Sequence, residues 1–274
     1  MFDSTEAKPM TMSICTTCGT QYPDYPTHCP VCEDERQYVG ANGQTWTTHD
    51  ALKASHGLRM QDESGVLGIA LSPDFAINQR SLYLPTDAGN ILWECLSLVT
   101  DEAVAALNAR GGVDLIAISH PHFYSSMIEW SDALGGVPIL LHEADRSWVR
   151  RSSPQLRFWS GDTHRLSDRV TLIRSGGHFH GSTVLHWKDG PRSGGALFSG
   201  DAPQVVSDRR HVSFMYSYPN HMPMKPAAVR GMQRRLAGYA FEDVFGFTWG
   251  RDIIGGGRAA VDASFERYLS AIAD

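Results

Sequence analysis

The chain has 274 residues, of which 42% are hydrophobic and 20% are charged, a composition typical of a globular protein. Its formal net charge of −6, without any cluster of basic residues interleaved with aromatics, argues against nucleic-acid binding. No apolar run is long enough to cross a membrane, and residues 1–10 lack the apolar core of an export signal. We therefore expect a cytoplasmic protein with one sizeable domain and a small appendage, and without nucleic-acid or membrane partners.

The appendage is predicted in residues 1–40, where four of the five cysteines form two Cys-x-x-Cys pairs. Thiolates at this spacing can surround one metal ion, usually a structural Zn²⁺. Two disulfides or a redox pair are the alternatives, but disulfides are rare in a reducing cytoplasm. The segment resembles a zinc ribbon, and its Cys-Pro-x-Cys half also resembles rubredoxins, which implies that iron could occupy this site. The predicted ligands are Cys15, Cys18, Cys29 and Cys32.

Residues 41–274, the predicted main domain, contain short apolar runs that predict strands and amphipathic stretches that predict helices. Strands are expected at residues 66–71, 81–84, 91–95, 113–118, 137–142, 170–174, 183–187, 196–199 and 244–248. Helices are expected at residues 101–109, from 127, near 148, at 224–238 and at 257–274, the first of them with Thr100 as its N-cap. No element is predicted for residues 38–64. Strand blocks with interspersed helices, repeated in two halves, favour a layered α/β architecture.

Several predicted strands run into turns that carry side chains able to bind a metal. His120 and His122 follow the strand of residues 113–118, and residues two apart in an extended segment point the same way. Both imidazoles can therefore reach one ion. Later strands run into a glycine-rich turn that contains His178, a turn that contains Asp201, and a final turn that contains Arg251. Ligand sites of α/β layers lie at such strand ends.

The order and spacing of these motifs resemble the metallo-β-lactamase-fold hydrolase superfamily, from residue 65 to the C-terminus. Within it, the chain is most similar to a bacterial branch of uncharacterised members with an N-terminal zinc knuckle. The resemblance implies a four-layered αββα sandwich with a metal site at one edge between the sheets. It also implies a first metal site built by His120, His122 and His178, with Asp201 as the acidic residue beside it.

The second metal site of the superfamily is where this chain departs from the pattern. At the positions of the expected ligands it has Tyr124, Ser125 and Arg251. We therefore expect a mononuclear centre, with one catalytic Zn²⁺ beside the structural one. Three imidazoles leave a position for water, whose pKa zinc can lower to about 7. The predicted function is a metallohydrolase acting on an ester, lactone, thioester, amide or phosphoester.

The remaining candidates surround that centre. Asp201 would bind the metal or its water, and Arg251 would neutralise a substrate anion or stabilise an oxyanion. Tyr124 would orient the substrate or protonate a leaving group. Ser125, His180 and His221 are candidates for contact with the substrate, a small molecule that could be anionic, and His221 could also replace a missing ligand. The sequence does not predict an oligomeric state.

Two alternatives to a hydrolase stay open. The superfamily includes iron-dependent members, and histidines with a carboxylate suit non-haem Fe(II), so an iron oxygenase is one alternative. The other is a catalytically silent metal-binding or scaffold protein, because loss of the second-site ligands is also what functional decay would produce.

Overall fold

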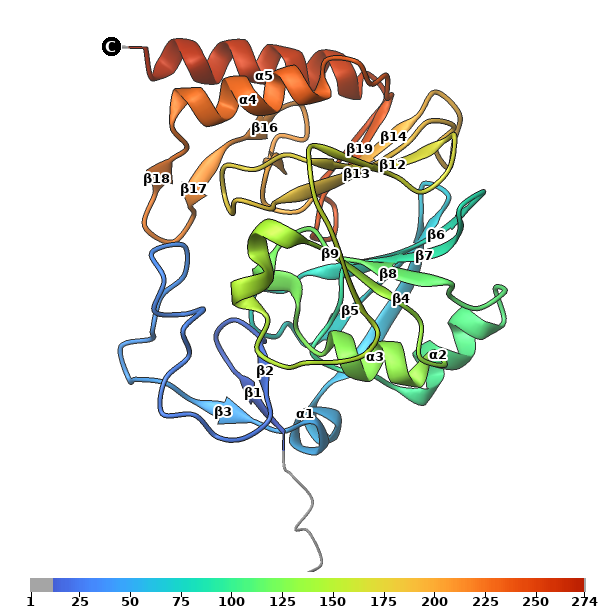
Figure 1. Ribbon diagram of the computed structural model, residues 1–274, viewed down its shortest axis with the longest axis vertical. Coiled ribbons are helices and arrows are strands. Elements are labelled where there is room, and N and C mark those ends of the chain that lie inside the picture. The colour runs from blue at the N-terminus through green and yellow to red at the C-terminus, as the bar shows by residue number, and fades with distance from the viewer. Residues whose placement is uncertain (1–11, 274) are drawn as a thin grey trace, which may run out of the picture.

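The computed structural model describes residues 12–273. Residues 1–11 and residue 274 lie outside the described residues. The prediction that residues 1–10 lack an export signal concerns this undescribed segment. Two β-sheets pack face to face, and helices cover both outer surfaces (Figure 1). The helices are α2 (Asp101–Asn108) and α3 (Met127–Ala133) on one side, and α4 (Pro226–Leu236) and α5 (Gly257–Ala271) on the other. The predicted four-layered αββα sandwich is confirmed.

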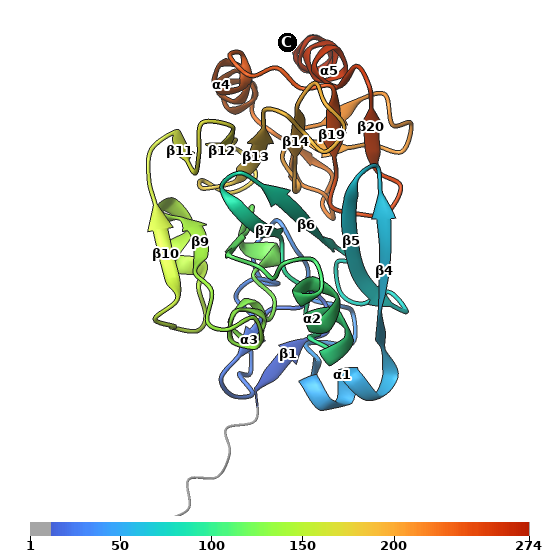
Figure 2. The same ribbon diagram turned by 90° about the vertical axis from the view of Figure 1, so that its right-hand side faces the viewer.

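The first sheet has seven strands in the order β10-β9-β8-β7-β6-β5-β4, most of which can be followed from left to right in Figure 2. Strands β4 to β7 form an antiparallel meander, and β7 to β10 are parallel. Helices α2 and α3 are the crossovers between parallel strands. The strand bounds are β4 (Gly57–Glu63), β5 (Val66–Ser72), β6 (Arg80–Thr86), β7 (Gly89–Trp93), β8 (Leu115–Ala117), β9 (Ile139–His142) and β10 (Leu156–Trp159).

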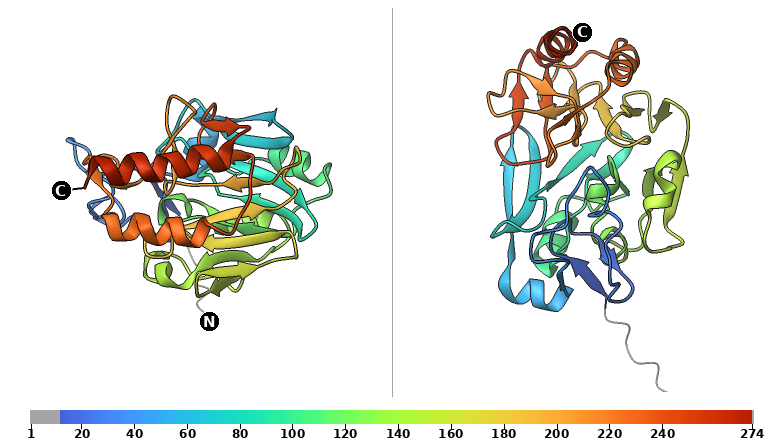
Figure 3. Two further views of the ribbon diagram at one scale, coloured as in Figure 1. Left: turned by 90° about the horizontal axis from the view of Figure 1, so that it is seen from above. Right: turned by 90° about the vertical axis from the view of Figure 1, so that its left-hand side faces the viewer.

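The second sheet has six strands in the order β11-β12-β13-β14-β19-β20, antiparallel except between β14 and β19. Seen from above, α4 and α5 lie side by side across these strands (Figure 3, left). The strand bounds are β11 (Thr163–Arg165), β12 (Val170–Arg174), β13 (Thr183–Trp187), β14 (Ala196–Phe198), β19 (Asp243–Phe245) and β20 (Asp252–Ile254). Two short hairpins, β15 (Gln204–Val205) with β16 (Val212–Ser213) and β17 (Met215–Ser217) with β18 (Met222–Pro223), precede α4.

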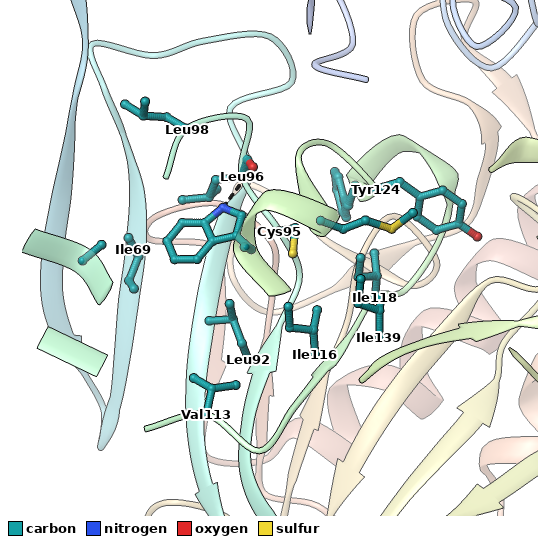
Figure 4. Close-up of a cluster of buried hydrophobic side chains, with 14 of the residues drawn as sticks. Ile69, Leu92, Cys95, Leu96, Leu98, Val113, Ile116, Ile118, Tyr124 and Ile139 are labelled. Carbon is teal, nitrogen blue, oxygen red and sulfur yellow. Dashed lines mark hydrogen bonds between the residues drawn. The ribbon is translucent and has the colours of Figure 1, made fainter. Parts of the chain in front are cut away.

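Alternation along the strands separates the hydrophobic core into layers. In β13, Leu185 packs between the sheets, whereas its neighbour Val184 packs under α4 and α5. A third layer lies between the first sheet and α2 and α3, and part of it is drawn in Figure 4. At its centre Trp130 is fully buried and donates its indole N–H to the carbonyl oxygen of Leu96 at 3.1 Å, the dashed line of Figure 4. Both faces of each sheet are therefore covered.

The predicted elements are confirmed wherever an apolar pattern marks them. Helix α2 begins after Thr100, whose hydroxyl accepts a hydrogen bond from the backbone N–H of Ala103. The unassigned region contains α1 (His49–Ser55) and the edge strand β4, whose side chains are mostly exposed and so show no apolar alternation. Asp252, which follows Arg251 in the expected final turn, begins β20. Among residues 12–273, no helix is both long and apolar enough to span a bilayer.

The N-terminal knuckle packs on the core of the first sheet through Ile14 and reaches the β17–β18 hairpin. Its small sheet consists of β1 (Ser13–Cys15), β2 (Gln21–Tyr22) and β3 (Trp46–Thr47), so the sheet extends past residue 40. In Figure 1 a loop of the knuckle, in blue, extends to the β17–β18 hairpin, and Ser217 and Asn220 of that hairpin both donate to the carbonyl oxygen of Glu35.

Candidate metal centre

Three turns, each at the end of a strand, bring four ligand residues together. His120 and His122 lie just after β8, where the chain enters the short 3₁₀ helix η1 (Pro121–Phe123). His178 lies in the turn between β12 and β13, and Asp201 follows β14. All four side chains are buried, and their ligand atoms lie within 4.8 Å of one another. These are the four residues that the sequence indicated as ligands of one metal ion, and the structure brings them together.

Glycines allow two of these turns to approach the cluster. Gly177 has φ +85°, and a Cβ there would lie 2.2 Å from the sulfur of Met224. At Gly200 a Cβ would lie 2.3 Å from the hydroxyl of Ser119. A Cβ at either position would force a neighbouring side chain to move, and the positive φ of Gly177 is one that glycine adopts readily, so glycine favours the placement of the residue that follows. The loop of His120 is held by Glu94, whose carboxylate accepts from the backbone N–H of Ser119 at 3.1 Å.

The ligand atoms are spaced like the vertices of a tetrahedron. Asp201 Oδ2 lies 3.2 Å from His120 Nε2, 3.5 Å from His122 Nδ1 and 3.3 Å from His178 Nε2. His178 Nε2 is also 3.3 Å from His122 Nδ1. A tetrahedral ion with arms of about 2.0–2.1 Å, as for zinc with nitrogen and oxygen, has ligands about 3.3–3.4 Å apart. The residues present therefore fit one four-coordinate metal ion.

Outer contacts orient two of the imidazoles toward that common point. His178 Nδ1 lies 2.8 Å from the carbonyl oxygen of Tyr216. Because a carbonyl oxygen only accepts hydrogen bonds, Nδ1 carries the proton, and Nε2 of the same ring keeps a free lone pair. His120 Nδ1 lies 2.8 Å from the hydroxyl of Ser119. His120 Nε2 has no hydrogen-bond partner, although it is buried and close to Asp201. A buried nitrogen without a partner, beside other ligand atoms, is the arrangement that a metal ion completes.

The electrostatics of the cluster favour a cation. Burial lowers the pKa of His120 to about 4 and that of His122 to about 3, against the opposing influence of Asp201. Both imidazoles are therefore neutral near pH 7, the form that binds metals. Burial opposes ionisation of Asp201, but the close contacts of its Oδ2 with the three histidines hold its pKa well below the usual value. The cluster thus presents one negative charge and neutral nitrogen donors.

A cavity of about 270 Å³ reaches the cluster through Asp201. Its walls come from the knuckle, from the hairpin region after β14 and from the segment before β6. They combine aromatic rings with amides and hydroxyls. Its lining residues include Arg36, Tyr38, Asp201, Tyr218 and Phe247. The phenol of Tyr218 donates to the backbone carbonyl of Asp201 at 2.8 Å, which fixes one wall.

Arg36 of the knuckle is a site residue that the sequence did not reveal. Its guanidinium lies 3.7 Å above the ring of Phe179 and donates to the carbonyl oxygen of His178 at 3.0 Å. It also forms a two-pronged pair with Asp34 at 2.5 and 2.8 Å. The contact with His178 joins residues 142 positions apart, so no local pattern could have indicated it.

The other predicted site residues lie elsewhere. Tyr124 is buried in the core beside α3, and Ser125 accepts a hydrogen bond from Gln79 at 2.8 Å. The guanidinium of Arg251 donates to Ser207, and within residues 12–273 it is Arg36, not Arg251, that contacts a histidine of the cluster. His180 is exposed beyond the glycine-rich turn, and His221 is exposed at the tip of the β17–β18 hairpin with φ +53°.

The knuckle holds a second group of ligands. The four cysteine sulfurs lie within 4.8 Å of one another, with 3.5 Å between Cys15 and Cys32 and 3.6 Å between Cys18 and Cys29. All four are buried free thiols, which argues against the disulfide alternative. An ion with metal–sulfur distances of about 2.3 Å would have sulfurs about 3.8 Å apart. The two observed sulfur–sulfur distances, 3.5 and 3.6 Å, are slightly shorter than this value, so the sulfurs would move apart slightly around an ion. The four cysteines therefore fit one metal site.

Comparisons with known proteins place the chain in a family. No family model matches it. It is 37% identical over 265 residues to the uncharacterised protein YmaE of Bacillus subtilis (strain 168), covering 94% of this chain and 96% of that protein. Its fold is similar to that of DIM-1 metallo-β-lactamase exposed to ceftazidime, with a TM-score of 0.55 and 12% identity over 78% of this chain and 97% of that one. A di-iron-bound form of TTHA1623 gives a TM-score of 0.51 and 19% identity, covering 70% of this chain and 96% of that one.

Similarity to YmaE extends over nearly the whole of both chains, and the αββα sandwich is the fold that the chain shares with the structural neighbours. The chain belongs to the family of the uncharacterised protein YmaE, and it has the fold of the metallo-β-lactamases.

Proposed function

We propose that this protein is a mononuclear metal-dependent hydrolase whose ion is held by His120, His122, His178 and Asp201. The observation that carries the proposal is the tetrahedral spacing of these four ligand atoms, at a point that a cavity reaches. The positions that would bind a second ion hold Tyr124, Ser125 and Arg251. Tyr124 packs in the core, Ser125 bonds Gln79 and Arg251 bonds Ser207.

When bound, a zinc ion would act as a Lewis acid, and because the three histidines and Asp201 already supply four ligands, a nucleophilic water would need a fifth position on the ion. The chain's own groups bind and orient the substrate. All three histidine contacts of Asp201 use Oδ2, so Oδ1 is the oxygen available to hold a proton or a polar group of the substrate on the cavity side. We also infer a reducing cytoplasmic environment, because the knuckle cysteines bind a metal only as free thiolates.

The cavity favours a small substrate with a neutral polar group. Arg36, the guanidinium in its wall, is already paired with Asp34, so it offers no uncompensated charge to a carboxylate or phosphate. Tyr38, Tyr218 and Phe247 offer aromatic surface for an apolar part. An ester, lactone or thioester matches these walls better than a phosphoester does, so we rank the carbonyl substrates first.

Metal counting tests the centre itself. Elemental analysis of the purified chain should give about two ions, one in the knuckle and one in the cluster. His122→Ala should lose only the cluster ion. His180→Ala is the matched control, because this exposed histidine lies two residues from a ligand without joining the cluster. Two ions in the cluster would refute a mononuclear centre.

Turnover tests the chemistry. The zinc-loaded chain should hydrolyse members of a panel of p-nitrophenyl esters, lactones and thioesters, and Asp201→Asn and His122→Ala should abolish this activity while His180→Ala retains it. A chain that binds one cluster ion and turns over no member of the panel would instead favour the catalytically silent metal-binding protein.

An iron oxygenase is the second candidate. The similar fold of TTHA1623 binds two irons, and a set of histidines with one carboxylate suits Fe(II). Iron in the cluster of the anaerobically purified chain, together with O₂ consumption that His122→Ala abolishes, would favour this candidate. Zinc as the native ion would exclude it.

A further inference from the structure

The knuckle and the His/Asp cluster are joined by a short segment, Asp34 to Arg36. Arg36 is only four residues after the ligand Cys32, and its side chain extends away from the knuckle to the turn of His178. Its side chain is 10% exposed. The guanidinium is surrounded by the rings of Phe179, Trp148 and Tyr216, at 3.7, 5.1 and 5.5 Å from the three centroids.

His178 is held from two directions, and both lead back to this segment. Its backbone carbonyl accepts from Arg36 Nη1 at 3.0 Å. Its Nδ1–H donates to the carbonyl of Tyr216 at 2.8 Å. Tyr216 lies in β17, and the next residue, Ser217, donates to the carbonyl of Glu35 at 2.6 Å. The knuckle therefore fixes the main chain of His178 directly and its imidazole through the hairpin.

The turn of His178 needs such external support. Gly176 and Gly177 precede the ligand, both with positive φ, and glycine has more backbone freedom to lose on folding than any other residue. Local sequence therefore does little to hold the turn in one conformation. Partners that orient a metal-binding histidine typically change metal affinity by about 10–100-fold.

We propose that Arg36 is a positioning residue through which the four-cysteine knuckle keeps His178 in its metal-binding orientation, so that the cluster depends on a folded knuckle. The inference rests on the metal centre of the proposed function but not on hydrolysis. A chain that binds one ion in the cluster and hydrolyses nothing would refute the function and leave this inference open to its own test.

Cobalt titration of the full chain tests it, because the two sites have different spectra. Co²⁺ in the four-cysteine site gives thiolate-to-metal charge-transfer bands, whereas Co²⁺ in the His/Asp cluster gives only weaker d–d bands. Arg36→Met should weaken Co²⁺ binding in the cluster by about 10–100-fold and leave the charge-transfer bands unchanged. Arg36→Lys, which keeps a charged donor, should restore part of the affinity.

The matched control is Arg150→Met, because Arg150 also lies by the ring of Trp148, at 6.0 Å, but donates to Ser147 and Trp148 instead of His178. It should leave both spectra unchanged. If the affinity of the cluster for Co²⁺ in Arg36→Met is within twofold of the wild type, with an intact knuckle, the proposal is overturned.

Should Arg36→Met lose the charge-transfer bands as well, Ser217→Ala becomes the deciding variant. It removes the hydrogen bond to Glu35 and the one that Ser217 accepts from the backbone N–H of Asn220 within the hairpin. A cluster affinity reduced severalfold supports the coupling, whereas an unchanged affinity overturns it.

Discussion

Arg80 is a buried cation that links the two sheets near the cavity. Its side chain is completely buried, and its guanidinium pairs with Glu63 of β4 and with Asp252 of β20 in the second sheet. Its Nε and Nη2 also donate to the carbonyl oxygen of Gly246, at 3.1 and 2.9 Å. Its backbone N–H donates to the carbonyl oxygen of Phe247, a wall of the cavity, at 2.7 Å. One side chain thus satisfies two carboxylates and a carbonyl.

Arg80→Met should destabilise the fold strongly. Methionine fills much of the volume, but Glu63 and Asp252 lose their common cation inside the protein. Removing one partner of a buried ion pair costs about 3–5 kcal/mol, and we expect this loss in the free energy of unfolding from urea denaturation at pH 7. Arg165→Met is the control. Its pair with Asp168 is exposed, at 67% and 94% of the side chains, so no measurable change is expected.

The same variant should acquire a pH dependence. Burial raises the pKa values of Glu63 and Asp252, and Arg80 opposes the rise, so both pKa values should climb further without it. A carboxyl group whose pKa is higher in the folded than in the unfolded chain stabilises the fold below its unfolded-state pKa, near 4. This stabilisation is lost as the pH rises through the folded-state pKa. The deficit of Arg80→Met should therefore be small at pH 4 and largest at pH 8. A deficit below about 1 kcal/mol at pH 7, or one that is equal at both pH values, would refute the reasoning.

Three further predictions concern the site and the core. Burial raises the pKa of Glu94 to about 8, so in urea unfolding the metal-free wild-type chain should lose stability relative to Glu94→Gln as the pH rises from 5 to 8; a stability difference that does not change with pH would contradict it. Gly200→Ala should displace Ser119 and His120 and weaken Co²⁺ binding in the cluster by about 10–100-fold, with the knuckle spectrum unchanged as internal control. Trp130→Phe should remove one of the two donors to the carbonyl of Leu96, leaving the backbone N–H of Ser126 at 3.3 Å, and should cost about 0.5–1.5 kcal/mol in urea unfolding; no measurable loss would contradict it.

The sequence by itself determined the features that depend on local patterns. Short apolar runs mark the buried strands, and Thr100 marks the start of α2. The two Cys-x-x-Cys pairs mark the knuckle, whereas the four residues of the cluster were indicated by the resemblance to the metallo-β-lactamase fold, through motifs in the turns after three strands. These predictions succeed because strand alternation, helix capping and ligand spacing are properties of a few consecutive residues.

Only the tertiary structure decided which cation approaches the metal centre. Arg251 is at the position that the superfamily pattern indicates, yet it bonds Ser207, and Arg36 reaches His178 from the other end of the chain. The exposed edge strand β4 and the pairing of Arg80 across the sheets were equally absent from the sequence pattern. In each case the contact joins residues far apart in the chain, or the strand lacks a buried face, so only the folded arrangement of the layers brings these side chains to their partners.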